Sequence, residues 1–157
     1  MREILFRGKN LNGEWLVGDY EHFNLSDGEL ITYISVWGKK NDKVIPETVG
    51  QYTGLTDKNG KKIFEGDIIR YADEGEYNMY LESLECPEDY EGVDFSDLWT
   101  YDIVVYGIAV GYPAFDLNNH EWECNGLSNL GESYQYFYEV IGNIHDNPEL
   151  LKECEGK

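Results

Sequence analysis

The chain of 157 residues has the length of one ordinary domain, and its 15% aromatic content argues against general disorder. Its formal net charge of −19 excludes the basic surface that nucleic-acid-binding proteins usually present. The charged N-terminus does not resemble a signal peptide, and no segment has the run of about 20 apolar residues that crosses a bilayer. We therefore expect a cytoplasmic protein with no membrane association.

The negative charge is concentrated in the second half of the chain. Residues 1–70 hold 10 Lys/Arg and 11 Asp/Glu, a net of −1, whereas residues 71–157 hold 2 and 20, a net of −18. Such a half repels phosphate backbones and anionic membranes and attracts basic proteins. The plainer alternative is that the charge only keeps the protein soluble.

The first 49 residues predict an N-terminal β region. Asn12-Gly13 is a strong hairpin signal, because both turn positions tolerate positive φ, and it separates strand patterns at residues 4–7 and 14–20. A second hairpin is expected from a turn at residues 26–28 and a strand at residues 29–37. A charged loop at residues 39–43 and a short strand at residues 44–49, broken by Pro46, follow.

Residues 50–72 favour short, bent strands of a small barrel. A strand at residues 50–55 precedes a turn at residues 57–60, and the apolar pairs Ile63-Phe64 and Ile68-Ile69 flank a second turn at Gly66-Asp67.

Residues 73–102 predict an inserted acidic arm rather than core. Leu81, Leu84 and Met79 are expected along one side of a short helix that Pro87 ends. Acids alternate here with large aromatic residues, a composition that suits binding to a basic protein surface. The candidate partner-binding residues are Tyr77, Tyr80, Glu85, Asp89, Asp94, Phe95, Asp97 and Trp99.

Strands are expected again at residues 101–111, 120–124 and 134–144. Residues 111–113 predict a turn between the first two of them, and residues 126–131 a loop. A C-terminal helix is expected at residues 148–155, with Asn147 as N-cap and Pro148 at the first helical position.

Three segments together resemble the YopX family: residues 1–9 with 13–18, residues 48–69, and residues 139–151. The resemblance does not extend to residues 73–102 or 111–133. It implies a single domain over residues 1–157 that is mainly β: an N-terminal region at residues 1–49 and a small SH3-like barrel or roll at residues 50–151. It also implies a bacteriophage or prophage protein of uncharacterised function, located in the cytoplasm of the bacterial host, with no catalytic residues to transfer.

The segment at residues 54–66 has the spacing of neither a phosphate-binding loop nor an EF-hand calcium loop. Gly54 and Gly60 are separated by five residues rather than the four of a phosphate-binding loop, so a hairpin turn is preferred. The register that places Gly60 sixth in a calcium loop puts Leu55 first and Gly66 twelfth, where carboxylates are required. Loose calcium binding by the acidic arm stays open.

Metal and catalytic sites are also not expected. Cys86, Cys124 and Cys154 are odd in number and widely spaced, which indicates free thiols in a reducing compartment. His120 and Cys124, with Cys86, lack the close spacing of a zinc site. Pairing of Cys124 with His22 or His145 as a nucleophile is unsupported, and no carboxylate pair stands out for glycoside hydrolysis.

The sequence therefore predicts a non-enzymatic, cofactor-free protein-interaction or regulatory module with a basic host or phage protein as partner. One alternative is an acidic mimic of nucleic acid that inhibits a host DNA-binding protein, and another is an unrecognised hydrolase. Direct nucleic-acid binding is not expected, although the near-neutral first half leaves it as a minor alternative. Exposed strand edges make a homo-oligomer plausible.

Overall fold

The computed structural model describes residues 3–28, 30–38, 41–109, 112–118, 127 and 136–154. The chain divides into two compact units. The first unit comprises Met1–Leu55 and Lys62–Glu65, and the second comprises Thr56–Lys61 and Gly66–Lys157.

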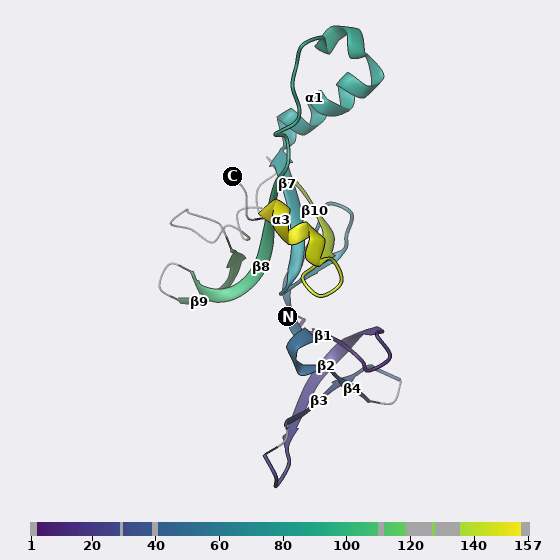
Figure 1. Cartoon of the computed structure of the whole chain (residues 1–157), viewed down its shortest axis with the longest axis vertical. Coiled ribbons are helices and arrows are strands. Elements are labelled where there is room, and N and C mark those ends of the chain that lie inside the picture. Colours follow the sequence, from purple (N-terminus) through teal and green to yellow (C-terminus); the bar gives the residue numbers. More distant parts are fainter. Residues whose placement is uncertain are drawn as a thin grey trace. The chain divides into compact units, whose positions relative to one another are not determined.

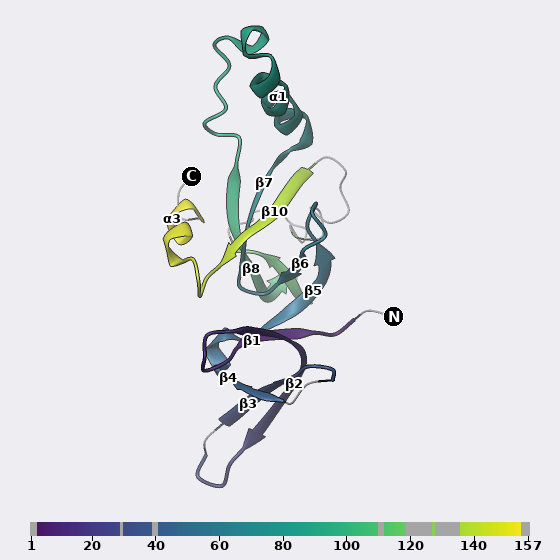
Figure 2. The same cartoon turned by 90° about the vertical axis from the view of Figure 1, so that its right-hand side faces the viewer.

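The first unit is built on one six-stranded sheet with the order β4-β3-β2-β1-β5-β6; Figure 1 labels β1 to β4, and Figure 2 labels β5 and β6 as well. A single 3-10 turn, η1, interrupts the described strands. The elements are β1 (Phe6–Lys9), β2 (Trp15–Asn24), β3 (Leu30–Ser35), β4 (Asp42–Val44), η1 (Pro46–Thr48), β5 (Gly50–Thr56) and β6 (Lys62–Phe64).

The predicted hairpin at Asn12-Gly13 is confirmed, and a buried Asn10 holds it together. Gly13 has a φ of 86°, and β1 pairs with β2 antiparallel on either side of the turn. The Asn10 Oδ1 accepts hydrogen bonds from the backbone N–H groups of Asn12 and Glu14, while its Nδ2 donates to the carboxylates of Glu14 and Asp42. One amide side chain therefore satisfies both sides of the turn at a position only 2% exposed.

Glycine at two positions lets the strands of the first unit approach closely. A Cβ on Gly18 would lie 2.1 Å from the carbonyl oxygen of Ser35 in the neighbouring strand. A Cβ on Gly8 would lie 3.0 Å from the Val44 Cγ2 and 3.3 Å from the Ile34 Cγ1. Ile34 and Val44 are almost fully buried, so Gly8 covers these apolar side chains with backbone.

The second unit contains a four-stranded antiparallel sheet with the order β10-β7-β8-β9, all labelled in Figure 1. Its helical segments lie at the tip of the β7–β8 hairpin and after β10. The elements are β7 (Asp67–Asp73), α1 (Glu74–Glu85), η2 (Pro87–Tyr90), β8 (Thr100–Ala109), β9 (Tyr112–Leu117), β10 (Tyr136–Asn143), η3 (Pro148–Leu150) and α3 (Leu151–Cys154).

The core of the second unit forms between this sheet and the C-terminal segment. Ile68, Ile69 and Val104 are fully buried on the central strands. Helix α3 packs against β8 and buries Cys154, whose thiol donates to the carbonyl of Leu150 at 3.7 Å. Strand β10 lies beside β7 at the edge of the described sheet. Because α3 packs on β8, the chain that follows β10 crosses β7 to reach it.

The segment Thr56–Lys61 covers the outer edge of β10, which would otherwise expose unpaired backbone groups. The Asp57 carboxylate accepts from the Val140 N–H at 3.0 Å, and the Lys58 N–H donates to the Tyr138 carbonyl at 3.2 Å. The Lys61 ammonium donates to the Val140 carbonyl at 3.3 Å. This turn therefore replaces a neighbouring strand along part of β10.

The prediction of a mainly β protein with a short C-terminal helix is confirmed. The described strands form two antiparallel sheets, and no closed barrel is found among them. Strands β5 and β6, expected within the barrel, belong to the sheet of the first unit. The C-terminal helix begins as η3 and continues as α3 to Cys154, and residue 155 lies outside the described residues. Asn147 stands at the expected N-cap position, but its side chain forms no capping hydrogen bond, and its Oδ1 accepts from the Asn143 N–H at 3.3 Å.

The turn predicted at residues 111–113 is wrong in extent. Tyr112 and Pro113 pair with Ala109 and Ile108 as the first residues of β9. Proline is accepted there because β9 is the last strand in the described sheet, so no strand on its other side needs a proline N–H. The strand expected at residues 120–124 and the loop expected at residues 126–131 lie outside the described residues, apart from Leu127.

Candidate protein interaction site

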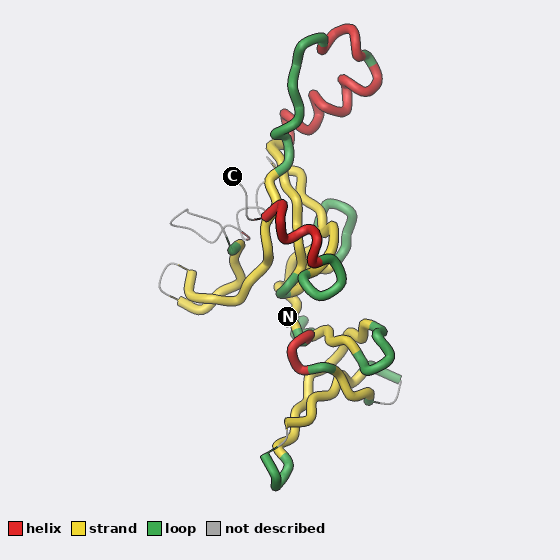
Figure 3. The backbone as a smooth tube through the Cα atoms, in the orientation of Figure 1, coloured by secondary structure: helices red, strands yellow, loops and turns green. Residues whose placement is uncertain are grey.

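The acidic arm is an excursion from the tip of the β7–β8 hairpin. Tyr71 pairs with Thr100, so the strands that enter and leave the arm are direct neighbours. Helix α1 occupies the first part of the arm (Figure 3). The Asp73 carboxylate caps it by accepting from the N–H groups of Gly75 at 2.8 Å and Glu76 at 3.2 Å. The predicted helix is therefore confirmed, and it ends at Glu85, two residues before Pro87.

Aromatic rings hold the base of the arm against the sheet. Tyr77 of α1 stacks on Phe137 of β10, with ring centroids 4.0 Å apart and an interplanar angle of 18°. Trp99 meets Phe137 edge to face at 5.7 Å and lies 5.4 Å from Tyr77. Such ring pairs stabilise by about 0.5–1.5 kcal/mol beyond the area that they bury. The arm is thus packed on its own scaffold at both of its ends.

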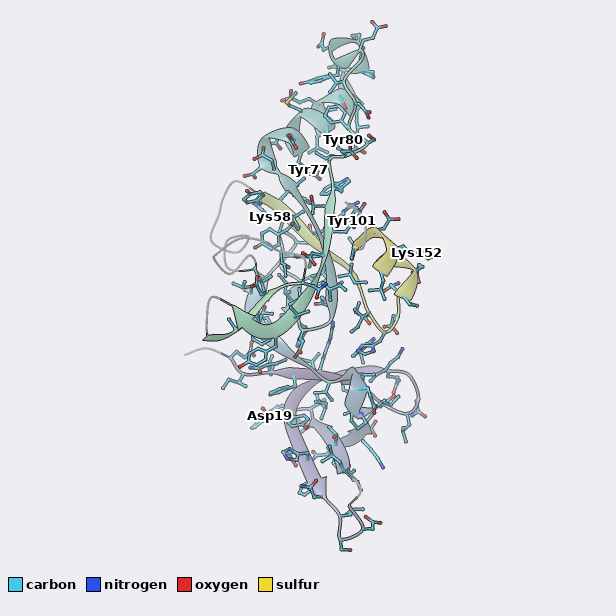
Figure 4. The ribbon with its side chains drawn as sticks, turned by 60° about the vertical axis from the view of Figure 1, so that its left-hand side comes forward. Asp19, Lys58, Tyr77, Tyr80, Tyr101 and Lys152 are labelled. Atoms are coloured by element: carbon cyan, nitrogen blue, oxygen red, sulfur yellow. The ribbon has the colours of Figure 1, made fainter. Side chains whose placement is uncertain are left out.

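A second group of rings closes the outer part of the arm. Phe95 lies 5.6 Å from Tyr80 and 6.4 Å from Tyr90, which brings the returning segment back against helix α1. The Tyr90 hydroxyl forms a short hydrogen bond with the Glu82 carboxylate, and this bond raises the pKa of Tyr90. We call Tyr77, Tyr80, Tyr90, Phe95, Trp99 and Phe137 the aromatic cluster; Figure 4 shows the first two of them on α1.

Two cations lie at the base of the arm. The Arg70 guanidinium lies 4.1 Å from the centre of the Trp99 ring and forms an ion pair with Glu139 on β10. The Lys58 ammonium lies 3.6 Å from the Glu74 carboxylate in the first turn of α1. These cations neutralise charge where the arm joins the sheet and leave its outer part strongly negative.

Carboxylates cover the exterior of the arm. Residues 73–102 contain 11 Asp/Glu and no Lys/Arg. The candidate acids Glu85, Asp89, Asp94 and Asp97 are all exposed. The Ser96 N–H donates to the Asp94 carboxylate at 2.9 Å and lowers its pKa, so this group stays ionised at neutral pH.

The structure thus separates the eight predicted partner-binding residues into two groups. Tyr77, Tyr80, Phe95 and Trp99 come together, but as half-buried members of the aromatic cluster. Glu85, Asp89, Asp94 and Asp97 lie on the exterior. The aromatic residues consequently have a structural role in positioning the arm, and the acids are the groups that a partner can reach.

Sequence reasoning missed the contacts that Phe137 and Arg70 make with the arm. Phe137 belongs to a run of alternating large residues, which predicts a strand but not the element that packs on it. Tyr138 pairs with Tyr71 in the sheet, and this register places Phe137 beside the arm. To predict that Phe137 contacts the arm, one would have needed to know that β10 pairs with β7.

Several apolar side chains are exposed on the arm. Leu81 is 41% exposed, Leu84 62%, Met79 44% and Val93 46%. The expectation that Met79 shares one side of the helix with Leu81 and Leu84 is wrong, because a step of 100° per residue puts Met79 about 140° from Leu84 around the axis. Leu81 and Leu84 are neighbours on the same face as Tyr77 and Tyr80.

In the first unit, cations pack on aromatic rings. The Arg7 guanidinium lies 5.0 Å from the Trp15 ring centre and 5.1 Å from that of Phe64, and the Lys9 ammonium lies 5.8 Å from Trp15. The Arg7 guanidinium also donates to the carbonyl of Glu65 at 3.1 Å. These cations therefore stabilise the sheet of their own unit.

The described residues contain no candidate metal centre. No group of three or more His, Cys, Asp or Glu side chains within them is arranged to hold a metal ion. Cys86 is an exposed free thiol and Cys154 a buried one. His120 and Cys124, whose spacing argued against a zinc site, lie outside the described part of the chain. Among the helices that the structure describes, none has the length and apolar character needed to span a membrane.

Together these features define a mainly β protein that carries an acidic, aromatically anchored arm at the tip of a hairpin. The family described as YopX protein matches residues 19–152, so the chain belongs to the YopX protein family. The crystal structure of protein EF1440 from Enterococcus faecalis is similar at 22% identity, over 96% of this chain and 99% of that chain, with a TM-score of 0.51. That likeness supports the fold alone. No curated protein matches the chain.

Proposed function

We propose that this protein is a non-enzymatic interaction module that binds a basic protein through its acidic arm. The observation that carries the proposal is the combination of 11 acids with no bases over residues 73–102, on a segment whose aromatic residues are already packed. A surface whose charges are held in place before binding loses less conformational entropy on association. The same charges steer a basic partner toward the arm during encounter.

We place this module, as the family resemblance implies, among phage or prophage accessory proteins acting in the cytoplasm of a bacterial host. In this proposal the four-stranded sheet of the second unit is the scaffold, and the acidic arm is the segment that binds the partner. A mimic of nucleic acid is a narrower version of the same idea, and it too would use exposed acids such as Glu85, Asp89 and Asp94. It differs in requiring a partner that also binds DNA.

A pull-down from lysate of the bacterial host tests the proposal. The full chain is compared with a variant that carries Glu85→Gln, Asp89→Asn, Asp94→Asn and Asp97→Asn. We expect the variant to lose a basic protein that the native chain retains at low salt, and the native chain to release that protein as salt is raised toward about 0.5 M. The matched control neutralises two exposed acids of the first unit, Asp19→Asn and Glu47→Gln, and retains the partner.

Three results separate the alternatives. Identical partner lists for the native chain and the arm variant refute the proposal. Competition between the captured protein's DNA and the arm assigns the nucleic-acid mimic. Turnover in hydrolase screens that disappears with a single Asp, Glu, Cys or His substitution assigns an enzyme instead.

A further inference from the structure

One face of helix α1 is apolar from Tyr77 to Leu84 but only partly covered. Tyr77, Tyr80, Leu81 and Leu84 follow the spacing i, i+3, i+4 and i+7, which places them on one side of the helix. The two tyrosines pack within the aromatic cluster. Leu81 and Leu84, in the later turns, remain 41% and 62% exposed. We call these two residues the leucine ridge.

Leu81 and Leu84 are not part of the buried core. The ring contacts of the arm join Tyr77, Tyr80, Tyr90 and Phe95 to aromatic neighbours, whereas both leucines are among the exposed large apolar side chains. Exposed leucine is unfavourable in water, and polar residues at both positions would complete the helix equally well. The ridge therefore has the character of a contact surface rather than of core.

The surrounding charge restricts what can cover the ridge. Glu85 lies one turn beyond Leu81 on the same side of the helix, and Glu88 and Asp89 follow in η2. A second copy of this chain would bring its own 11 acids against these, which opposes self-association through this face. An apolar partner surface bordered by Lys or Arg is complementary to it.

We propose that the leucine ridge is the anchor for an amphipathic basic helix of the protein partner. The apolar face of that helix would cover Leu81 and Leu84, and its Lys or Arg side chains would reach Glu85 and the acids of η2. This mode is the familiar one of an amphipathic helix on an apolar surface, with charge around the rim. The inference rests on the proposed function and adds the kind of segment that the arm recognises.

Two synthetic peptides of about 18 residues test the inference on the full chain. The first carries Leu on one helical face and Lys elsewhere, and the second has the same charge with Ser in place of every Leu. Fluorescence anisotropy at about 0.15 M salt measures the dissociation constant of each. We expect the Leu peptide to bind at least about tenfold more tightly than the Ser peptide, because only it can cover the ridge.

The double variant Leu81→Gln with Leu84→Gln removes the ridge and keeps residues that favour helix. We expect it to reduce the preference for the Leu peptide to less than about threefold while leaving the affinity for the Ser peptide unchanged. The matched control is Leu11→Gln, at a leucine 72% exposed in the first unit, and it keeps the full preference. Far-UV circular dichroism establishes that the variants retain the native helix content.

The remaining outcomes overturn the inference separately from the proposed function. A preference for the Leu peptide that survives in the double variant refutes the leucine ridge. If the four-acid variant described above then loses both peptides, the acidic arm still binds basic segments and only the ridge is refuted. If that variant binds both peptides as tightly as the native chain, the proposed function fails as well.

Discussion

Replacement of Asp57 by alanine should destabilise the second unit more than any exposed acid does. Asp57 is 5% exposed, and its Oδ1 accepts from the N–H groups of Asn59 and Lys61, each at 2.9 Å. Its Oδ2 accepts from the Val140 N–H on β10 at 3.0 Å. The carboxylate thus organises the turn and joins it to the edge of the sheet.

The size of the effect follows from these three bonds. A hydrogen bond to a charged group contributes about 1.5–3 kcal/mol, and a buried N–H left without a partner costs about 1–3 kcal/mol. Because the three bonds share one carboxylate they do not add fully, and we expect Asp57→Ala to lower the free energy of unfolding by about 3–5 kcal/mol. Asp57→Asn keeps one acceptor oxygen for the turn but presents an amide N–H toward Val140, so its loss should be about 2 kcal/mol.

Urea unfolding measures the loss of stability, and amide hydrogen exchange in β7, β8 and β10 assigns that loss to the second unit. Asp19→Ala, at an exposed aspartate of the first unit, is the control and should change stability by less than about 0.5 kcal/mol. A loss below about 1 kcal/mol for Asp57→Ala, with the Val140 amide as protected as in the native chain, would refute the assigned role.

Two further predictions concern backbone packing and pH. Gly18→Ala should destabilise the first unit by more than about 2 kcal/mol, because its Cβ would lie 2.1 Å from the Ser35 oxygen. Gly107→Ala, with nothing within 4 Å of the new Cβ, should be neutral, and equal stability of the two variants in urea would contradict this account. Burial, and then the charge of Asp102, raise the pKa of Tyr71 from 10.0 to about 12, so the unfolded chain loses this proton first and stability should fall as pH rises through that interval. The fall in the native chain should stay below about 2.7 kcal/mol, because solvent still reaches part of the Tyr71 ring. The fall should be smaller in Tyr71→Phe, which has no hydroxyl to titrate. Urea unfolding of both proteins at several pH values measures the difference, and parallel pH profiles would contradict the prediction.

Local signals predicted the elements that depend on local physics. The proline at residue 87 indicated where helix α1 ends, and the Asn12-Gly13 pair specified the first hairpin. Each of these signals acts over a few residues, where backbone conformation and capping hydrogen bonds are decided. The strand ending near residue 143 was equally evident from its apolar and aromatic run.

The parts that escaped prediction depend on partners far away in the chain. Whether Tyr77 contacts a partner protein or Phe137 of its own sheet is decided by pairing between β7 and β10. The carboxylate of Asp57 likewise finds Val140 across 83 positions. Period-2 alternation gives the face of a strand but not its neighbour, so the assignment of the arm aromatics to a packing role required the structure.

The path of the chain between the units has a consequence for dissecting this protein. The chain passes from one unit to the other after Leu55, after Lys61 and after Glu65, so no single cut yields both units complete. A fragment beginning at Gly66 would lack the turn that covers β10 and would leave the Val140 N–H and the Tyr138 carbonyl open to pairing with another molecule. Isolated fragments should therefore aggregate. A protein that contained the second unit without the first would need another segment to cover the exposed edge of β10.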